Sequence, residues 1–436
     1  MPLSINFQID THIKSFPARE SHYSRKDNNG VIYLSPDLNI SKMYNMYLEK
    51  HEPGYLVANR QDQTVQPIVK YAYFANRFST NFNIHFSNPR SDTCQKCDQL
   101  QNMIKSETNE DAINELKLEK EIHIRKAEVF YTDMKRFSTE AKLKDSVELL
   151  SFDYQQNMAL PYVPAGDVFY KRQLWSYNFC IHSAKTKKSY FFMYDESTAK
   201  KGQNEVISFL NYYFLNILSP DVNMVYLFSD NCSAQNKNKL LFAYLSALVN
   251  TPTNNIKHIV HRYPEPGHSF LACDRCFGHI EKLRRKVERV YLPTEYEKMV
   301  KDTNKNYNVI HVTQDMIYNY NDYLTPLCKK IITNTNKVKF LIMSYRYVEY
   351  KSEGIYCSIS GNSTAKELYS LEKVGSKLLL DQRFLHELYN GPIQLKQAKY
   401  NDVQQLAAKY VPNEHQWFYN NLQVLDTPNE QLSDSE

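Results

Sequence analysis

Leu149-Leu150-Ser151-Phe152-Asp153 is an apolar run that ends in a carboxylate, and the pattern returns in Met224-Val225-Tyr226-Leu227-Phe228-Ser229-Asp230. Short apolar runs of this kind predict buried β-strands. A third stretch, Gly267-His268-Ser269-Phe270-Leu271-Ala272-Cys273-Asp274, opens a helical pattern that carries Glu281. Two carboxylates at strand ends and a third on a helix predict an acidic cluster at one edge of a sheet, where such groups hold divalent metal ions. The pattern favours phosphoryl-transfer chemistry on nucleic acid.

Strands and helices alternate around these runs. The expected order is β-β-β-α-β-α-β-α, with elements over 147–153, 174–181, 189–194, 203–218, 224–229, 236–248, 256–260 and 274–290. The first three strands have short connections, so they are expected to be antiparallel neighbours, whereas parallel strands need helical crossovers. Residues 147–295 are therefore predicted to form an α/β domain with a mixed sheet.

Composition sets broad limits on the class of protein. The chain has 436 residues, of which 42% are hydrophobic, so it can bury a sizeable core, and its length suggests two to three domains. The 53 Lys and Arg exceed the 48 Asp and Glu by 5. This mild basic balance permits binding to nucleic acid without requiring it.

Cysteine usage and the N-terminus bear on the compartment. The eight cysteines are too few and too unevenly spaced for a secreted fold stapled by disulfides. The start of the chain lacks the pattern of a signal peptide, and no apolar run approaches the ~20 residues that a membrane span needs. We expect no membrane association and a reducing compartment, with the nucleus preferred and the cytosol as the alternative.

Helical spacing organises the chain before residue 147. Residues 1–90 are predicted to be a mainly helical N-terminal region, in which aromatic residues recur every four positions at Phe74, Phe78 and Phe82. These aromatics fit either a helix-turn-helix remnant or ordinary core packing. Residues 91–146 are predicted to be a helical segment that opens on a Cys-x-x-Cys pair.

That pair is a candidate structural zinc site. Two thiolates at the spacing of Cys94 and Cys97 can reach one tetrahedral ion, and His123 on the following helix is a candidate third ligand. The fourth ligand is left open among His22, His51 and His85. The alternative is that the two cysteines are ordinary buried thiols. The second pair, Cys273 and Cys276, overlaps the acidic motif and is interpreted as coincidental.

The C-terminal third is less informative. Residues 296–425 are predicted to be a small α+β module, with strands within 337–360 and helices within 402–422. The acidic and polar residues 426–436 are expected to be disordered.

Three phrases together resemble a known group of proteins. They are Ser229-Asp230-Asn231-Cys232-Ser233-Ala234-Gln235-Asn236-Lys237-Asn238, the stretch from Gly267 to Glu281, and Asp92-Thr93-Cys94 with Cys97-Asp98 upstream. They resemble an uncharacterised transposase-derived family common in arthropod genomes. More broadly, the element order and acid positions over about residues 147–295 resemble the RNase H-like fold of DDE transposases and retroviral integrases.

The resemblance implies a metal-dependent enzyme that cuts or joins DNA. Asp153 would bridge two Mg²⁺ or Mn²⁺ ions, and Asp230 would hold one of them. Asp274 and Glu281 lie two helical turns apart on one face, so either fits the third position. Asp274 also fits a helix N-cap, in which case Glu281 would be the ligand. The resemblance implies DNA as the partner and leaves assembly into a homo-oligomer open.

Polar and basic residues beside the acids are candidates for supporting roles. Gln155, Gln235, Asn236 and His268 are expected to orient metal ligands or substrate phosphates, with turn hydrogen bonds as the alternative. Phosphate contacts are expected from the basic cluster after Glu281, or else it forms a solvated helix face; its members are Lys282, Arg284, Arg285 and Lys286.

Three functional hypotheses remain open from the sequence. The first is an active DNA strand-transfer enzyme, and the second is a domesticated derivative that binds DNA or protein without cutting. The third is an RNase H-like nuclease unrelated to mobility. The carboxylates at 153 and 230 favour the first and third. Because no complete DNA-reading module precedes residue 90, an N-terminally shortened and inactive copy is a further alternative.

Overall fold

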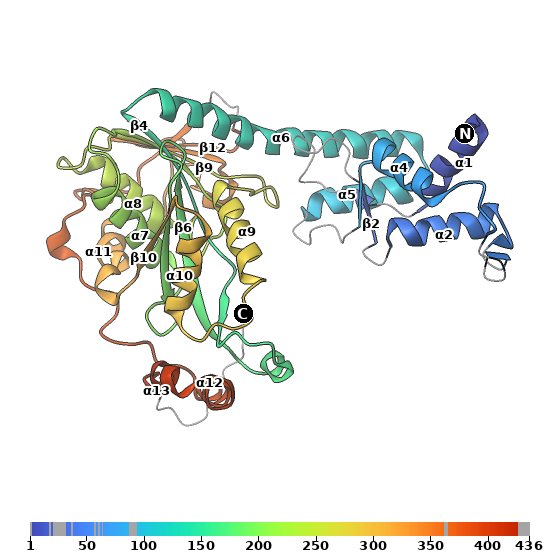
Figure 1. Ribbon diagram of the computed structural model, residues 1–436. Coiled ribbons are helices and arrows are strands. Elements are labelled where there is room, and N and C mark those ends of the chain that lie inside the picture. The colour runs from blue at the N-terminus through green and yellow to red at the C-terminus, as the bar shows by residue number, and fades with distance from the viewer. Residues whose placement is uncertain are drawn as a thin grey trace. The chain divides into compact units, whose positions relative to one another are not determined.

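The computed structural model describes residues 2–16, 19–20, 32–35, 38–55, 58–59, 62, 64–86, 94–361 and 365–425. The chain divides into two compact units, residues 1–123 and 124–436 (Figure 1). His22 and the predicted disordered tail over 426–436 lie outside the described residues. None of the described helices combines the length and apolarity needed to cross a bilayer.

The first unit is mainly helical, as predicted. Its elements are α1 (Leu3–Lys14), β1 (Arg19–Glu20), β2 (Ile32–Leu34), α2 (Ile40–His51), α4 (Tyr71–Asn81), β3 (Ile84–Phe86), α5 (Gln95–Ser106) and the first part of α6 (Glu110–Leu143). Helix α2 begins where the side chain of Asn39 accepts a hydrogen bond from the backbone N–H of Lys42 at 2.8 Å. Such a cap satisfies one of the free donors of the first turn.

The aromatic repeat of this unit serves its core. Phe74 and Phe78 are buried against Ile9, Met43 and Tyr47, which come from α1 and α2. The aromatic repeat runs to Phe82, but helix α4 ends at Asn81, because the chain then becomes extended to form β3. The packing interpretation of the repeat therefore accounts for both buried phenylalanines.

The second unit is of the α/β class, as predicted. Its helices and strands are β4 (Val147–Tyr154), β5 (Met158–Leu160), β6 (Leu174–Ser183), β7 (Ser189–Asp195), α7 (Gln203–Asn216), β8 (Met224–Phe228), α8 (Lys239–Asn250), β9 (His258–Arg262), α9 (Ala272–Arg284), α10 (Pro293–Thr303), β10 (Tyr307–His311), α11 (Tyr320–Leu324), β11 (Tyr347–Lys351), β12 (Gly354–Ser358), β13 (Glu367–Tyr369), α12 (Gln397–Tyr410) and α13 (Gln416–Asn420).

These strands form one mixed sheet in the order β10-β7-β6-β4-β8-β9-β11-β12-β13, with β5 paired to β6. Strand β4 lies inside the sheet, antiparallel to β6 and parallel to β8, and β9 continues parallel to β8. The predicted small C-terminal module does not form a sheet of its own. Instead β10 joins β7 at one edge, and β11 joins β9 to extend the other side.

Alternate residues of each strand point to opposite faces, and the two faces carry separate cores. Phe179 and Ile181 pack with α7 and α8, whereas Cys180 between them packs with α9 and α10. Figure 1 shows these helix pairs on the two sides of the sheet. Because Asp153 is paired in register with Cys180, it lies on the face covered by α9.

The C-terminal part of α6 packs on the same face, over β4 and β8. Phe137 stacks on Tyr226 with ring centroids 3.8 Å apart, and Phe130 packs against Phe228. Asp153 and Asp230 lie at the carboxyl ends of β4 and β8, where other polar residues gather.

Candidate functional site

The parallel pairing of β4 and β8 brings the first two predicted acids together. Ser151 is paired with Phe228, so continuing the same register by two residues places Asp153 opposite Asp230. Asp153 is the penultimate residue of β4, and Asp230 follows β8 by two residues. Both carboxylates are partly exposed.

Asn236 links these two carboxylates. Its Nδ2 donates to Oδ1 of Asp230 at 2.8 Å, with a longer contact of 3.5 Å to Oδ1 of Asp153. Oδ1 of Asp230 also accepts from the backbone N–H of Cys232 at 2.9 Å, which fixes the turn after β8. The structure thus places the side chain of Asn236 beside both acids.

The surroundings of Asp153 disfavour the ionised form of its carboxyl group. Burial raises the pKa of its carboxyl well above the usual 3.8, and the negative charges of Asp230 and Asp274 raise it further. Among the described residues, oxygens from these three side chains do not all lie within 4.8 Å of one another. Asp153 is thus close enough to Asp230 and Asp274 to be affected by their charges, although the three carboxylates do not form one compact cluster.

Helix α9 carries Asp274 and Glu281, the two candidates for the third metal ligand, and it lies along β4. Near the start of α9, the thiol of Cys273 contacts the carbonyl oxygen of Ser151 at 3.1 Å. Two turns later, Nε2 of Gln155 donates to Oε1 of Glu281 at 3.0 Å. Asp153 lies between Ser151 and Gln155 in the sequence, so α9 runs past it with Asp274 and Glu281 on the intervening turns.

The two acids of α9 have different surroundings. The N-cap of α9 is Leu271, so Asp274 is not the N-cap that the sequence allowed; it is the third residue of the helix, and its Oδ2 accepts from the backbone N–H of Leu271 at 2.6 Å. Glu281 is ion-paired with Arg284 at 2.9 Å in addition to its bond with Gln155. Between them, a Cβ at Gly278 would meet nothing within 4 Å, so this face of the helix is open.

Lys201, which the sequence did not single out, contributes a positive charge near the acids. Its Nζ donates to Oδ1 of Asn157 at 2.9 Å and to the carbonyl oxygen of Gln155 at 3.3 Å. Burial lowers its pKa below 10.5, while the charges of Asp153 and Asp230 act in the opposite direction. Lys201 lies in the loop before α7 with no periodic pattern around it, so no local signal marks it.

A buried network of hydrogen bonds holds the backbone of Asn236 in place. Nε2 of His261 lies 2.9 Å from the hydroxyl of Ser229, and Nδ1 of His261 lies 2.9 Å from the hydroxyl of Tyr263. The hydroxyl of Tyr263 donates to the carbonyl oxygen of Asn236 at 3.1 Å. Burial lowers the pKa of His261 well below 6.5, so its ring is neutral. Oδ1 of Asn236 is buried and makes no hydrogen bond in the structure.

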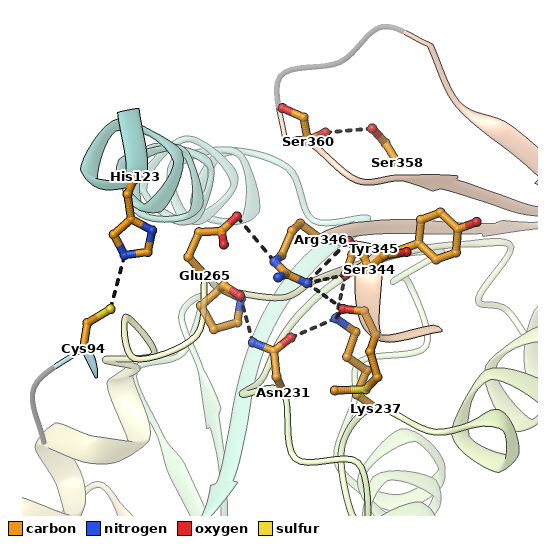
Figure 2. Close-up of polar contacts among 12 residues, drawn as sticks. Cys94, His123, Asn231, Lys237, Glu265, Ser344, Tyr345, Arg346, Ser358 and Ser360 are labelled. Atoms are coloured by element: carbon orange, nitrogen blue, oxygen red, sulfur yellow. Dashed lines mark hydrogen bonds and ion pairs between the residues drawn. The ribbon is translucent and has the colours of Figure 1, made fainter. Parts of the chain in front are cut away.

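Lys237 anchors the loop that follows Asp230. Its Nζ donates to Oδ1 of Asn231 at 2.8 Å and to the carbonyl oxygens of Tyr345 and Met343 at 2.6 and 3.3 Å (Figure 2). Asn231 in turn donates to the carbonyl oxygen of Pro264 at 2.8 Å. The loop is therefore tied to the segments before β11 and after β9.

Two other predicted neighbours of the acids, Gln235 and His268, contact the surrounding loops. Gln235 donates to the carbonyl oxygen of Lys201 at 3.3 Å, and the backbone carbonyl of His268 accepts from the hydroxyl of Tyr131 at 2.8 Å. Both contacts shape loops around the site. In the basic cluster, Arg284 is engaged by Glu281, whereas the other three members are exposed at the end of α9 and beyond it: Lys282, Arg285 and Lys286.

The thiols of the two Cys-x-x-Cys pairs have different environments. In the first unit Cys94, Cys97 and His123 are all buried, and their ligand atoms lie within 4.8 Å of one another. Cys273 and Cys276 belong to the core beneath α9, beside Cys180. The second pair therefore acts in packing, in line with its interpretation as a coincidence.

Comparison with known proteins gives one match. A family model described as a domain of unknown function (DUF7869) is similar to residues 179–352. The matched segment runs from within β6 to just after β11, so it includes Asp230, Asp274 and Glu281 but not Asp153. No curated protein and no solved structure matches the chain.

Proposed function

We propose that the second unit is an RNase H-like domain that cleaves or joins DNA phosphodiester bonds with two divalent metal ions. The proximity of Asp230 and Asp274 to Asp153, beside an inner parallel strand pair, carries this proposal. The strand order β7-β6-β4-β8-β9, with only β6 reversed relative to β4, supports the RNase H-like assignment. The resemblance to transposase-derived proteins belongs to the same proposal.

The donor set fits hard divalent cations. Carboxylate oxygens are the ligands preferred by Mg²⁺ and Mn²⁺, and thiolates or imidazoles would be expected for a zinc centre. The buried Oδ1 of Asn236 has no hydrogen-bond partner, which is the kind of acceptor that a bound cation or its water satisfies. When bound, a metal pair activates the attacking oxygen and neutralises the leaving oxygen of the phosphodiester.

The side chains prepare the site for this chemistry. Asp153 retains its proton more readily than an exposed carboxyl, so a cation must displace that proton. Asn236 holds the carboxylates of Asp153 and Asp230 in a fixed relative position. The ammonium group of Lys201, close to both acids, is placed to contact a phosphate of the substrate.

For the third metal ligand we favour Asp274 over Glu281. The charge of Asp274 acts directly on Asp153, whereas Glu281 is already paired with Arg284 and Gln155. Glu281 would then orient the helix instead of binding the ion. DNA as the partner and the nucleus as the location follow from this proposed function, with Lys282, Arg285 and Lys286 as phosphate contacts.

The proposal is tested by Mn²⁺-supported nicking of a DNA substrate. Asp153→Asn keeps the side chain's volume, so DNA binding at matched salt should persist, while cleavage should fall by about 10³-fold or more. Asp302→Asn, a change of the same charge at an exposed position on α10, is the control and should leave cleavage unchanged. Equal cleavage by wild type and Asp153→Asn would refute this site. DNA binding without cleavage by the wild type would favour the domesticated alternative.

A further inference from the structure

The first unit contains a cluster of soft ligands that the proposed DNA chemistry does not use. Sγ of Cys94 lies 3.2 Å from Nε2 of His123, and the ligand atoms of Cys94, Cys97 and His123 all lie within 4.8 Å of one another. All three side chains are buried. Figure 2 shows His123 projecting from the long helix toward Cys94. We propose that these residues bind a structural zinc ion.

Local structure explains how the two thiols come together. Cys94 has an extended backbone and is the residue before α5, and Cys97 is in the first turn of that helix. A pair spaced by three residues across a helix start presents both sulfurs on one side, which is a common zinc-binding arrangement. His123 lies on α6, so the ion would bridge two consecutive helices separated by a short connection, residues 107–109.

The ligand chemistry selects zinc over the cations expected at the acidic site. Two thiolates and an imidazole are soft or borderline donors, which suit Zn²⁺ and bind Mg²⁺ or Mn²⁺ poorly. Two thiolates also balance the charge of a divalent ion inside the protein. A tetrahedral site has a fourth position. Among the described residues, neither His51 nor His85 joins this group, so two of the three candidates for the fourth ligand are removed, and the third, His22, lies outside the described residues.

The packing around α5 shows why a metal would be needed. The apolar core of the first unit consists of α1, α2, α4 and nearby residues, and it includes no residue of α5. On α5 the buried side chains are Cys97 and Leu100, and neither belongs to any of the described core clusters. A helix with so little apolar burial needs another source of stability. Zinc coordination would supply it by joining α5 to α6.

The experiment measures zinc in the full-length protein. The wild type and Asp153→Asn should each contain about one zinc per chain, and Cys94→Ser and Cys97→Ser should contain almost none. Cys328→Ser, which changes a buried thiol of the second unit, is the matched control and should retain the ion. Because Asp153→Asn keeps its zinc, failure of the acidic site and failure of this site are distinguishable.

A second measurement keeps the test decisive if the cysteine variants do not fold. Wild-type protein stripped with a strong chelator and reloaded with Co²⁺ should show the charge-transfer absorption of cobalt–thiolate coordination. The chain has 13 histidines, and each one except His123 is replaced by alanine in turn. A change in the cobalt spectrum would identify a histidine at the fourth position, and no change in any variant would favour water there. Folded, metal-free wild-type protein without cobalt–thiolate absorption on reloading would overturn the proposal.

Discussion

Arg262 and Asp133 form an ion pair of 2.8 Å in the interior of the second unit, where the side chain of Arg262 is only 1% exposed. Arg262 is the last residue of β9, and Asp133 projects from α6. The pair therefore holds the long helix against the sheet, together with the stacking of Phe137 on Tyr226. Burial lowers the pKa of Arg262, and the charge of Asp133 opposes that shift.

Breaking this pair should be strongly destabilising. Asp133→Ala leaves the buried guanidinium without its counter-charge, and we expect a loss of about 3–5 kcal/mol in the free energy of unfolding. The measurement is urea unfolding of the full chain. Asp133 also pairs with Arg136, whose side chain is 66% exposed, so Arg136→Ala is the control and should cost less than about 1 kcal/mol. Similar losses in the two variants would contradict the structural role of the buried pair.

Two glycines should respond to alanine with opposite signs. A Cβ at Gly361 would lie 2.3 Å from Nη2 of Arg262 and 2.6 Å from Cγ1 of Val129, so Gly361→Ala should destabilise by about 1–3 kcal/mol. At Gly278, in the exposed interior of α9, the new methyl group meets nothing within 4 Å, so Gly278→Ala should stabilise by about 0.5–1 kcal/mol. Thermal unfolding of both variants checks the pair. Stabilisation by the change at Gly361 would show that Arg262 is free to move.

The sequence was informative wherever local pattern determines structure. The strand predicted over 147–153 is β4 at 147–154, and the strand predicted over 224–229 is β8 at 224–228. Their apolar runs and terminal acids carry the information, and one register then brings Asp153 opposite Asp230. The two strands are neighbours inside the sheet, as the predicted acidic cluster at one edge of a sheet requires.

What depends on distant contacts could not be predicted. Strand β10 pairs with β7 over a separation of more than 100 residues, and nothing in its own five residues indicates that partner. The positioning of Asn236 by His261 and Tyr263 likewise arises only in the folded protein.

Loss of Asn236 should weaken metal binding at the acidic site. Asn236→Ala removes the amide that donates to Asp230 and contacts Asp153, so the two carboxylates lose their fixed separation. We expect the affinity for Mn²⁺, measured by titration calorimetry, to fall by about 10- to 100-fold. Asn216→Ala changes an exposed asparagine of α7 and should leave the affinity unchanged. A folded Asn236→Ala variant with wild-type affinity would remove this residue from the site.

Lys237 should make the stability of the protein depend on pH in the alkaline range. Burial lowers its pKa from 10.5 to about 7, and the charge of Arg346 contributes. Between these two values the folded protein binds fewer protons here than the unfolded chain, so the free energy of unfolding rises with pH. In Lys237→Met this contribution is absent. The wild type should therefore gain at least about 1 kcal/mol relative to the variant between pH 7 and 9.

Urea unfolding of both proteins at several pH values measures this difference. Lys237→Met has two opposite effects on stability: Asn231 and the carbonyl of Tyr345 lose their donor, whereas the cost of burying an ammonium group disappears. The test therefore rests on how the difference between the two proteins changes with pH. An offset that is constant from pH 7 to 9 would mean that Lys237 stays fully charged in the folded protein.

Without metal, ionisation of Asp153 should destabilise the folded protein, whereas ionisation of a paired carboxyl group usually stabilises it. The pKa of Asp153 is raised well above 3.8 by burial and by the charges of Asp230 and Asp274. As the pH rises above about 4, the unfolded chain releases this proton before the folded protein does, so Asp153 lowers the free energy of unfolding until its folded pKa is passed. Asp153→Asn avoids this cost. Its melting temperature without added Mn²⁺ should therefore exceed that of the wild type at pH 7, and by less at pH 4.

Added Mn²⁺ should then invert the order, because the cation stabilises the ionised carboxylate that the variant lacks. The melts are done after dialysis into Mn²⁺-free buffer without a strong chelator, so that metal bound by Cys94 and Cys97 is left in place. Asp302→Asn should follow the wild type under all conditions. If Asp153→Asn melts below the wild type at pH 7 without Mn²⁺, and Mn²⁺ raises both melting temperatures equally, the carboxyl of Asp153 serves the fold of the strand end and not a metal site.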